Sequence, residues 1–222
     1  MATLYIVATP IGNLEDMTFR AVRVLKECAV VFCEDTRTTR VLFDRYDIRV
    51  PTESFHAQSP LSKMDRIVAL LEEGKDIALV SDAGTPGISD PGMLLVSEVR
   101  RRIPEASVVA VPGPSALAAA VSIAGKPLHE FVFLGFLPHK KGRQTIFEEI
   151  KTGERPYVFY ESPHRIEKTL ESLVGCGKTV TVLREMTKIH ESYVSGTAEE
   201  VLAAFKAKPE TIRGEFVVIV NA

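Results

Sequence analysis

The amino-acid sequence predicts an α/β protein made of two domains. Short apolar segments alternate with segments of helical periodicity through most of the 222 residues. Short strands that are apolar on both faces are typical of a mostly parallel sheet covered by helices on both sides. In the second half several strand-like segments follow one another closely, which favours antiparallel pairing. We therefore expect an N-terminal α/β domain with a mostly parallel sheet, residues 1–115, and a C-terminal mixed α/β domain, residues 116–222.

The elements of the first domain follow from apolar spacing and from residues that begin or stop helices. Pro60 suits the first turn of a helix, Ser59 is expected to cap it, and Gly74 is expected to stop it. The predicted strands are residues 4–8, 30–33, 77–80 and 108–111. The predicted helices are residues 18–26, 60–73, 93–102 and 115–124.

The second domain has a more aromatic first strand and fewer residues between its later strands. Its predicted strands are residues 131–136, 157–160, 180–183, 193–195 and 216–220, and its predicted helices are residues 142–150 and 164–174. The domain boundary is placed near residues 112–128, where three prolines and two glycines cluster.

Composition and charge exclude several classes of protein. Apolar residues make up 45% and charged residues 25%, and the formal net charge is −2, whereas tight nonspecific binders of nucleic acid are usually basic. The sequence has no apolar run of about 18 residues and no basic segment followed by an apolar one at its start. We therefore expect a cytoplasmic protein with no membrane partner.

Cysteine and histidine patterns favour no metal site. The three cysteines, Cys28, Cys33 and Cys176, form no CxxC pair, and the five histidines form no HxxxH or HxH pair. Because Cys28 and Cys33 lie in an apolar stretch, we expect them to be buried, reduced thiols.

Three loops that contain glycine and proline follow predicted strands of the first domain. They read Thr-Pro-Ile-Gly-Asn at residues 9–13, Ser-Asp-Ala-Gly-Thr-Pro-Gly at residues 81–87, and Val-Pro-Gly-Pro-Ser at residues 111–115. In open α/β sheets, ligands bind beyond the carboxyl ends of the strands, and parallel strands bring such loops to one edge. The first loop is not GxGxxG, so a dinucleotide site is not supported. The loops predict a small-ligand site of another kind.

Individual residues of these loops allow two interpretations each. Residues 81–92 contain three glycines, two prolines and two aspartates, which exceeds what a simple turn needs. The carboxylate of Asp82 suits a cation or a ligand hydroxyl, but it also suits a turn or a helix cap. Ser115 is equally suited to capping the following helix and to contacting a ligand.

Other candidate residues lie outside the three loops. Asp35 and Arg37, in the string Glu-Asp-Thr-Arg after the second strand, suit proton transfer and phosphate contact, or else a surface salt bridge. His56 is a lone histidine that suits proton transfer or a structural role. The basic string His-Lys-Lys-Gly-Arg at residues 139–143 suits phosphate contact or a solvated loop.

Seven motifs, in order along nearly the whole chain, resemble those of the 16S ribosomal RNA (cytidine-2′-O)-methyltransferase family, in the tetrapyrrole-methylase superfamily. They are Leu-Tyr-Ile-Val-Ala-Thr-Pro-Ile-Gly-Asn-Leu at residues 4–14, Glu-Asp-Thr-Arg at 34–37, Ala-Leu-Val-Ser-Asp-Ala-Gly-Thr-Pro at 78–86, Val-Pro-Gly-Pro-Ser at 111–115, Gly-Phe-Leu-Pro at 135–138, Phe-Tyr-Glu-Ser at 159–162 and Gly-Glu-Phe at 214–216. The string Ser-Asp-Ala-Gly-Thr-Pro is highly specific, whereas a single Pro-Gly pair is not.

The resemblance implies a tetrapyrrole-methylase-like fold of two α/β domains, with S-adenosyl-L-methionine in the cleft between them, and a homodimer. Its implied substrate is 16S rRNA in the small ribosomal subunit. The implied cofactor contacts are Pro10, Ile11, Gly12, Asp82, Ala83, Gly84, Thr85, Ser115 and Ala116, with a looser match at Glu161 and Met186.

Two other functions remain open from the residues. One is methylation of a tetrapyrrole ring carbon, although ring methylases more often have Gly-Asp-Pro where this chain has Ser-Asp-Ala-Gly-Thr-Pro. The other is a non-catalytic ribosome-associated module of the same fold. For the RNA reaction, Asp35 and His56 are the candidate general bases and Arg37 is the candidate phosphate contact.

Overall fold

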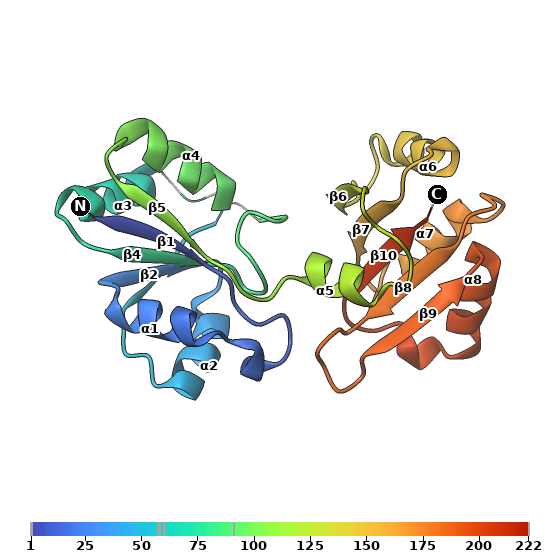
Figure 1. Cartoon of the computed structure of the whole chain (residues 1–222), viewed down its shortest axis with the longest axis horizontal. Helices are drawn as coiled ribbons and strands as arrows, with labels where there is room; N and C mark the ends of the chain where they lie inside the picture. Colours follow the sequence, from blue (N-terminus) through green and yellow to red (C-terminus); the bar gives the residue numbers. More distant parts are fainter. Residues whose placement is uncertain (1, 57–58, 60, 91, 222) are drawn as a thin grey trace. The chain divides into compact units, whose positions relative to one another are not determined.

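The structure is a computed structural model that describes residues 2–56, 59, 61–90 and 92–221. Contacts divide the chain into two compact units, Met1–Ser115 and Ala116–Ala222 (Figure 1). Each unit has its own sheet and its own apolar core, and each is described by itself.

The first unit is built on a parallel sheet of five strands in the order β3-β2-β4-β1-β5. The strands are β1 (Thr3–Val7), β2 (Val30–Cys33), β3 (Thr52–Ser54), β4 (Ile77–Val80) and β5 (Ser107–Val111). The helices are η1 (Leu14–Asp16), α1 (Phe19–Glu27), α2 (Thr36–Tyr46), α3 (Leu61–Glu72) and α4 (Gly92–Arg102).

Helices cover both faces of this sheet, as Figure 1 shows. On one face, α1 and α2 bury Leu25 and Phe43 against Val7 and Val80. On the other face, α3 and α4 bury their apolar residues against Leu4 and the rest of that face. All four residues of β4 are buried, because the strand lies between two strands and between two layers of helices. The predicted parallel sheet with two covered faces is therefore confirmed.

Helix ends follow the local sequence signals. The Oγ1 of Thr18 accepts a hydrogen bond from the backbone of Ala21 and begins α1. Gly74, at φ +79°, ends the turn after α3 as predicted, because this backbone conformation favours glycine. Pro60 lies outside the described residues, and the Oγ of Ser59 accepts a hydrogen bond from the backbone N–H of His56.

Two α-helices, one strand and the two short 3-10 helices were absent from the sequence prediction. Helix α2 buries Thr39, Leu42 and Phe43 on one side. Its sequence is otherwise polar and rich in threonine, so the apolar periodicity of a helix is difficult to recognise. Strand β3 has three half-buried residues, too few for a clear alternation. Helix α8 (Ala198–Ala207) carries a capping box between Thr197 and Glu200, a signal that is readable in the sequence.

The second unit is built on a mixed sheet in the order β6-β7-β10-β8-β9, in which only β6 and β7 are parallel. The strands are β6 (Val132–Phe136), β7 (Tyr157–Glu161), β8 (Val180–Arg184), β9 (Ser192–Gly196) and β10 (Phe216–Val220). The helices are α5 (Ala116–Ile123), α6 (Arg143–Thr152), α7 (Ile166–Leu173), α8 and η2 (Pro209–Thr211).

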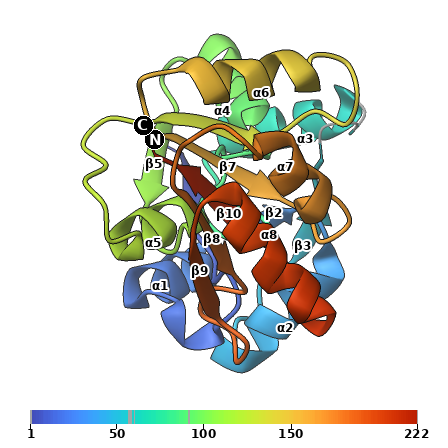
Figure 2. The ribbon, with the colours of Figure 1, turned by 90° about the vertical axis from the view of Figure 1, so that its right-hand side faces the viewer.

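Helices α6, α7 and α8 pack on one face of this second sheet through a common apolar core. Figure 2 shows α5 on the other side of the sheet, where it contacts β10. The predicted antiparallel character of this half is confirmed by three of the four strand pairs.

The cysteines are all free, and Cys28 and Cys33 are buried as predicted. Burial raises the pKa of the Cys28 thiol to about 12 and also raises that of Cys33. Because the thiolate is the reactive form, these two side chains act as small apolar residues. Over the described parts of the chain, no helix combines the length and the apolar character needed to cross a bilayer.

Candidate functional site

After β1 and after β4, which are neighbours in the first sheet, the chain continues toward opposite edges of the sheet. From β1 the chain passes through α1, on one face, to β2, whereas from β4 it passes through α4, on the other face, to β5. Since β1 and β4 are neighbours, their carboxyl ends form a topological switch point. Ligands of open α/β sheets bind at this position.

The loops that follow β1 and β4 are hydrogen-bonded to each other. The backbone N–H of Thr9 donates to the carbonyl of Gly84 at 2.9 Å, and the N–H of Gly84 donates to the carbonyl of Thr9 at 3.0 Å. The buried Oγ1 of Thr9 also donates to the carbonyl of Ser81 at 3.0 Å, and the Oγ of Ser81 donates to the carbonyl of Gly84 at 3.2 Å. The two loops therefore form one rigid structure.

The loop after β5 joins the other two. The backbone N–H of Ala8 donates to the carbonyl of Val111 at 3.2 Å, and the Oγ1 of Thr85 donates to the carbonyl of Pro114 at 3.0 Å. A Cβ atom added at Gly113 would lie 3.0 Å from the Cβ of Ala8. The prediction that the three loops meet at one edge of the sheet is confirmed.

Gly84, in the second loop, packs against both of the other loops. Its φ is +82°, and an added Cβ atom would lie 3.3 Å from Cγ2 of Ile11 and 3.7 Å from the carbonyl oxygen of Pro114. Glycine is favoured here by its backbone conformation, and a side chain would make a tight contact with Ile11. Gly84 is buried and its N–H and C=O are both bonded to Thr9, so this glycine allows the loops to pack closely together.

Carboxylates gather around the loop after β4. The side chain of Asp82 is exposed, and its Oδ1 accepts a hydrogen bond from the backbone N–H of Asp35 at 3.0 Å. The carboxylate of Asp90 accepts two hydrogen bonds from backbone N–H groups of its own loop. Burial, together with the charges of Asp82 and Asp90, raises the pKa of Glu34. This edge of the sheet therefore favours cations and hydroxyl donors.

Asp35 begins helix α2 and pairs with Arg37. Its Oδ1 accepts from the backbone N–H of Arg37 at 2.8 Å, and its Oδ2 lies 2.6 Å from Nη2 of the guanidinium. The hydrogen bonds from Arg37 lower the pKa of Asp35 to about 2. Its carboxylate is thus ionised at neutral pH and is a weak proton acceptor. The surface salt bridge considered from the sequence is present, and 90% of the Arg37 side chain is exposed.

His56 is exposed two residues beyond the end of β3. Strands β2 and β3 are parallel neighbours, so Asp35 and His56 follow strands that end at the same edge of the sheet. The general-base and phosphate-contact roles of Asp35, His56 and Arg37 stay predictions.

A family model describing tetrapyrrole (corrin/porphyrin) methylases matches residues 3–202. The chain belongs to this family of methyltransferases. It is 46% identical to a ribosomal RNA small subunit methyltransferase I from Halalkalibacterium halodurans, over 99% of this chain and 75% of that protein. It is 43% identical to the protein of the same name from Thermotoga maritima, over 100% of this chain and 99% of that protein. The recognition made from the sequence motifs is therefore confirmed.

Solved structures of tetrapyrrole methylases share the fold. The methyltransferase CobJ has a TM-score of 0.71 at 20% identity, covering 100% of this chain and 95% of that chain. A uroporphyrin-III-C-methyltransferase from Thermus thermophilus has a TM-score of 0.64 at 19% identity, covering 100% of this chain and 94% of that chain. At these identities the likeness concerns the fold, and it confirms the predicted fold class.

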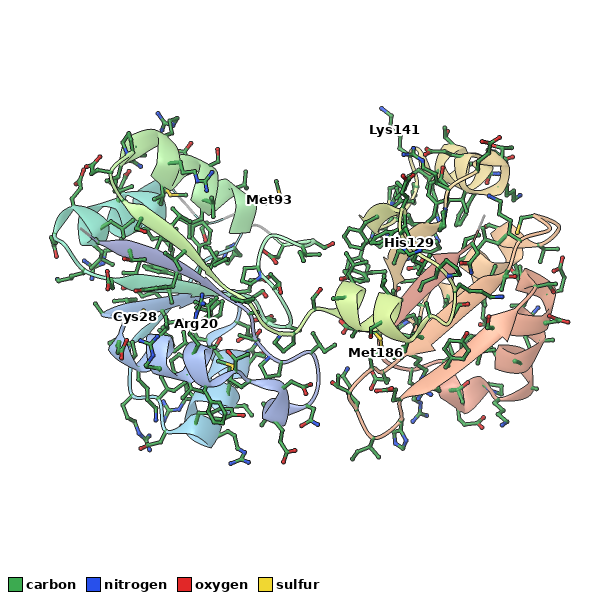
Figure 3. All side chains as sticks on the ribbon, viewed as in Figure 1. Arg20, Cys28, Met93, His129, Lys141 and Met186 are labelled. Carbon is green, nitrogen blue, oxygen red and sulfur yellow. The ribbon has the colours of Figure 1, made fainter. Side chains whose placement is uncertain are left out.

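Three of the cofactor contacts expected for this tetrapyrrole methylase lie in the second unit, and one of them, Ala116, begins α5. Met186, labelled in Figure 3, follows β8 and is 8% exposed. It stands between Glu185 and Thr187, which both have positive φ, at 51° and 69°. This backbone is unusual for residues with side chains and marks a tightly constrained loop.

Glu161, the third expected contact, ends strand β7 and is fully buried. Its Oε2 accepts from Nη2 of Arg143 at 2.9 Å and from Oγ1 of Thr169 at 2.7 Å. Its Oε1 accepts from the backbone N–H of Ser162 at 2.8 Å and pairs with Nε of Arg165 at 2.7 Å. Four donors match the roughly four lone-pair positions of a carboxylate. The side-chain oxygens of Glu161 are thus bonded within its own unit, and the cofactor contact expected at this residue stays a prediction.

Sequence reasoning missed this ion cluster and considered Arg143 as part of a basic loop that suits phosphate contact or exposure to solvent. Instead, 85% of the Arg143 side chain is removed from solvent and the guanidinium binds Glu161. No local signal pointed to this pair, because 18 residues separate the partners in the chain. The strands β6 and β7 bring them together.

Proposed function

We propose that this methyltransferase transfers a methyl group from S-adenosyl-L-methionine to the ribose 2′-hydroxyl of a cytidine in 16S rRNA of the small ribosomal subunit. The observation that carries the proposal is the set of three interlocked loops at the switch point, in a chain whose full-length relatives are named ribosomal RNA small subunit methyltransferases. The motif resemblance supports the finer assignment to cytidine and to the 2′-oxygen. It also supports a homodimer.

The loops suit S-adenosylmethionine in their charge. None of residues 9–13, 81–92 and 111–116 is a lysine or arginine, and Asp82 adds an exposed carboxylate. Both features suit a positively charged sulfonium and ribose hydroxyls. Gly84 packs tightly against Ile11 and Pro114, and a side chain here would disturb the arrangement of loops proposed to bind the cofactor. When bound, the cofactor supplies an already activated methyl group.

The residues proposed to hold the cofactor come from the three loops, from the first residue of α5 and from the segment that follows β8. They are Pro10, Ile11, Gly12, Asp82, Ala83, Gly84, Thr85, Ser115, Ala116 and Met186. Because the methyl donor is activated, the main task of the protein is to align the 2′-oxygen with the methyl carbon. The 2′-hydroxyl also distinguishes RNA from DNA.

A base of the protein must accept the hydroxyl proton as the new oxygen–carbon bond forms. Among the carboxylates that follow β2, Glu34 suits this task better than Asp35, because its pKa is raised whereas that of Asp35 is about 2. We therefore assign proton transfer to Glu34, with His56 as the competing residue. Arg37 remains the proposed phosphate contact.

Replacing Glu34 with glutamine is expected to lower kcat by about 10²–10⁴-fold, the usual contribution of a general base. Glu34 accepts the proton only when ionised, so the wild-type rate should fall as the pH falls through its raised pKa. Rates measured across pH for Glu34→Gln, Asp35→Asn and His56→Ala, with cofactor affinity measured alongside, test this. A larger loss in either of the other two variants, with Glu34→Gln unimpaired, would show the assignment to be wrong.

The proposed reaction is tested with the purified chain and tritiated S-adenosylmethionine. The acceptors are unmethylated small ribosomal subunits, free 16S rRNA and uroporphyrinogen. We expect label in the RNA, on a single cytidine 2′-oxygen when the product is analysed by mass spectrometry. Label in uroporphyrinogen alone would instead establish a tetrapyrrole methylase, and cofactor binding without transfer to any acceptor would establish a non-catalytic module.

A further inference from the structure

The end of strand β6 places an aromatic side chain and a basic loop side by side in the chain, on the surface of the second unit. We propose that Phe136, His139, Lys140 and Lys141, here called the 136–141 surface, bind the RNA substrate. Phosphates would contact the two lysines and a base would stack on Phe136. The inference rests on the proposed function, since it assigns the surface that recognises the RNA acceptor.

Phe136 is exposed because the strand is irregular. The pairing of β6 with β7 shifts register between Phe133 and Phe136, and Gly135 in between has φ +59°. A bulge of this kind re-aims the side chains that follow it. Phe136 is left 49% exposed while Leu137, next to it, is 2% exposed.

The ring of Phe136 packs against the ring of Tyr160, which packs in turn against Phe133. Its centroid lies 5.3 Å from that of Tyr160, which in turn lies 5.2 Å from that of Phe133. A fixed, half-exposed ring offers a flat face at little entropic cost. Unpaired RNA bases stack on such rings.

The loop that follows is basic and unneutralised. His139, Lys140 and Lys141 are exposed, and residues 131–147 include no aspartate or glutamate. Within the described part of the chain, neither lysine side chain has a hydrogen-bond or ion-pair partner. Lys141 extends away from the ribbon in Figure 3. In a chain of formal net charge −2, this local excess of positive charge marks a place for an anion.

Helix α6 adds to the positive potential of the loop. The helix has ten residues, and its N-cap, Gly142, makes no side-chain capping hydrogen bond. The N-terminal N–H groups and the helix dipole favour a negatively charged group at this end. The helix thus points its positive end at the same place as the two lysines.

The buried ion cluster of Glu161, Arg143 and Arg165 holds the backbone of this surface in place. Arg143, bound to Glu161, donates from Nη1 to the carbonyl of Pro138 at 3.2 Å. Arg165, bound to the same carboxylate, donates from Nη1 to the carbonyl of Leu137 at 2.8 Å. Glu161 is therefore a positioning residue, because it orders the backbone between Phe136 and the lysines.

The proposal is tested with one variant that removes the two lysine charges and another that removes the aromatic ring of Phe136. Lys140→Ala with Lys141→Ala should lower the slope of log affinity against log salt by about 1.4–1.8, since each phosphate contact contributes about 0.7–0.9. Phe136→Leu should weaken RNA binding about tenfold with little change in that slope. The probes are a 16S rRNA transcript and unmethylated small subunits, and the affinity for S-adenosylmethionine should stay within about twofold of wild type.

The matched control removes the same charge at the other end of the sheet, with Lys206→Ala and Lys208→Ala on and after α8. Lys206 makes only an exposed pair with Glu171, so this variant should bind RNA like wild type. Equal salt slopes in the two double variants, or RNA binding by Phe136→Leu equal to that of wild type, would overturn the proposal. Binding is measured without turnover, so an inactive wild type would contradict the proposed reaction alone.

Discussion

Replacing Glu161 with glutamine is expected to lower the free energy of unfolding by about 3–5 kcal/mol. The variant keeps the size of the side chain but removes a fully buried charge that pairs with two arginines, whose side chains are each 15% exposed. Two guanidinium groups would then be held away from water without a counter-charge. Since small domains are stable by about 5–15 kcal/mol, this is a large part of the total.

Urea unfolding followed by circular dichroism measures this effect. The control is Glu171→Gln, which breaks the exposed pair with Lys206 and should change stability by less than about 1 kcal/mol. If Glu161→Gln proved as mild as this control, the buried cluster would contribute little to the fold. The same variant, studied at a temperature where it remains folded, should also bind RNA more weakly, because its arginines order the 136–141 surface.

Replacing Gly84 with alanine is expected to weaken cofactor binding and to lower the methyl-transfer rate by up to about 100-fold. The added Cβ atom would lie 3.3 Å from Cγ2 of Ile11 and would push the first two loops apart. The contact requires a shift of a few tenths of an ångström, and alanine also strains a backbone at φ +82°. At a site that aligns reacting atoms, a misplacement of about 1 Å lowers the rate by about 100-fold, which sets the upper limit of the effect. Calorimetry with S-adenosylmethionine and single-turnover transfer to RNA measure the two losses.

Gly74→Ala is the matched control for backbone strain. Gly74 has φ +79°, close to the +82° of Gly84, but an added Cβ atom would meet nothing within 4 Å. Both variants share a strain of about 1–2 kcal/mol. Only Gly84→Ala should lose cofactor affinity, and an equal loss in both would mean that the loops are not the binding site.

The sequence predicted much of the site because its signals are local. Apolar strands such as β4 predict burial on both faces, and glycine and proline mark the loops that follow the strands. Asp35 could be foreseen as part of a salt bridge, because its partner Arg37 is two residues away. Its strongly lowered pKa follows first from the hydrogen bonds of the Arg37 guanidinium and then from the backbone N–H of the helix cap, both of which require the folded chain.

The sequence by itself determined the two-domain α/β class, the three loops and the family, because periodicity, turn residues and ordered motifs are properties of short segments. Tertiary structure alone decided that the loops interlock at the switch point and that Glu161 binds Arg143 and Arg165. It also decided that Phe136 is exposed, through a bulge paired against a neighbouring strand. These features depend on partners distant in the chain, and only strand pairing and packing bring such partners together.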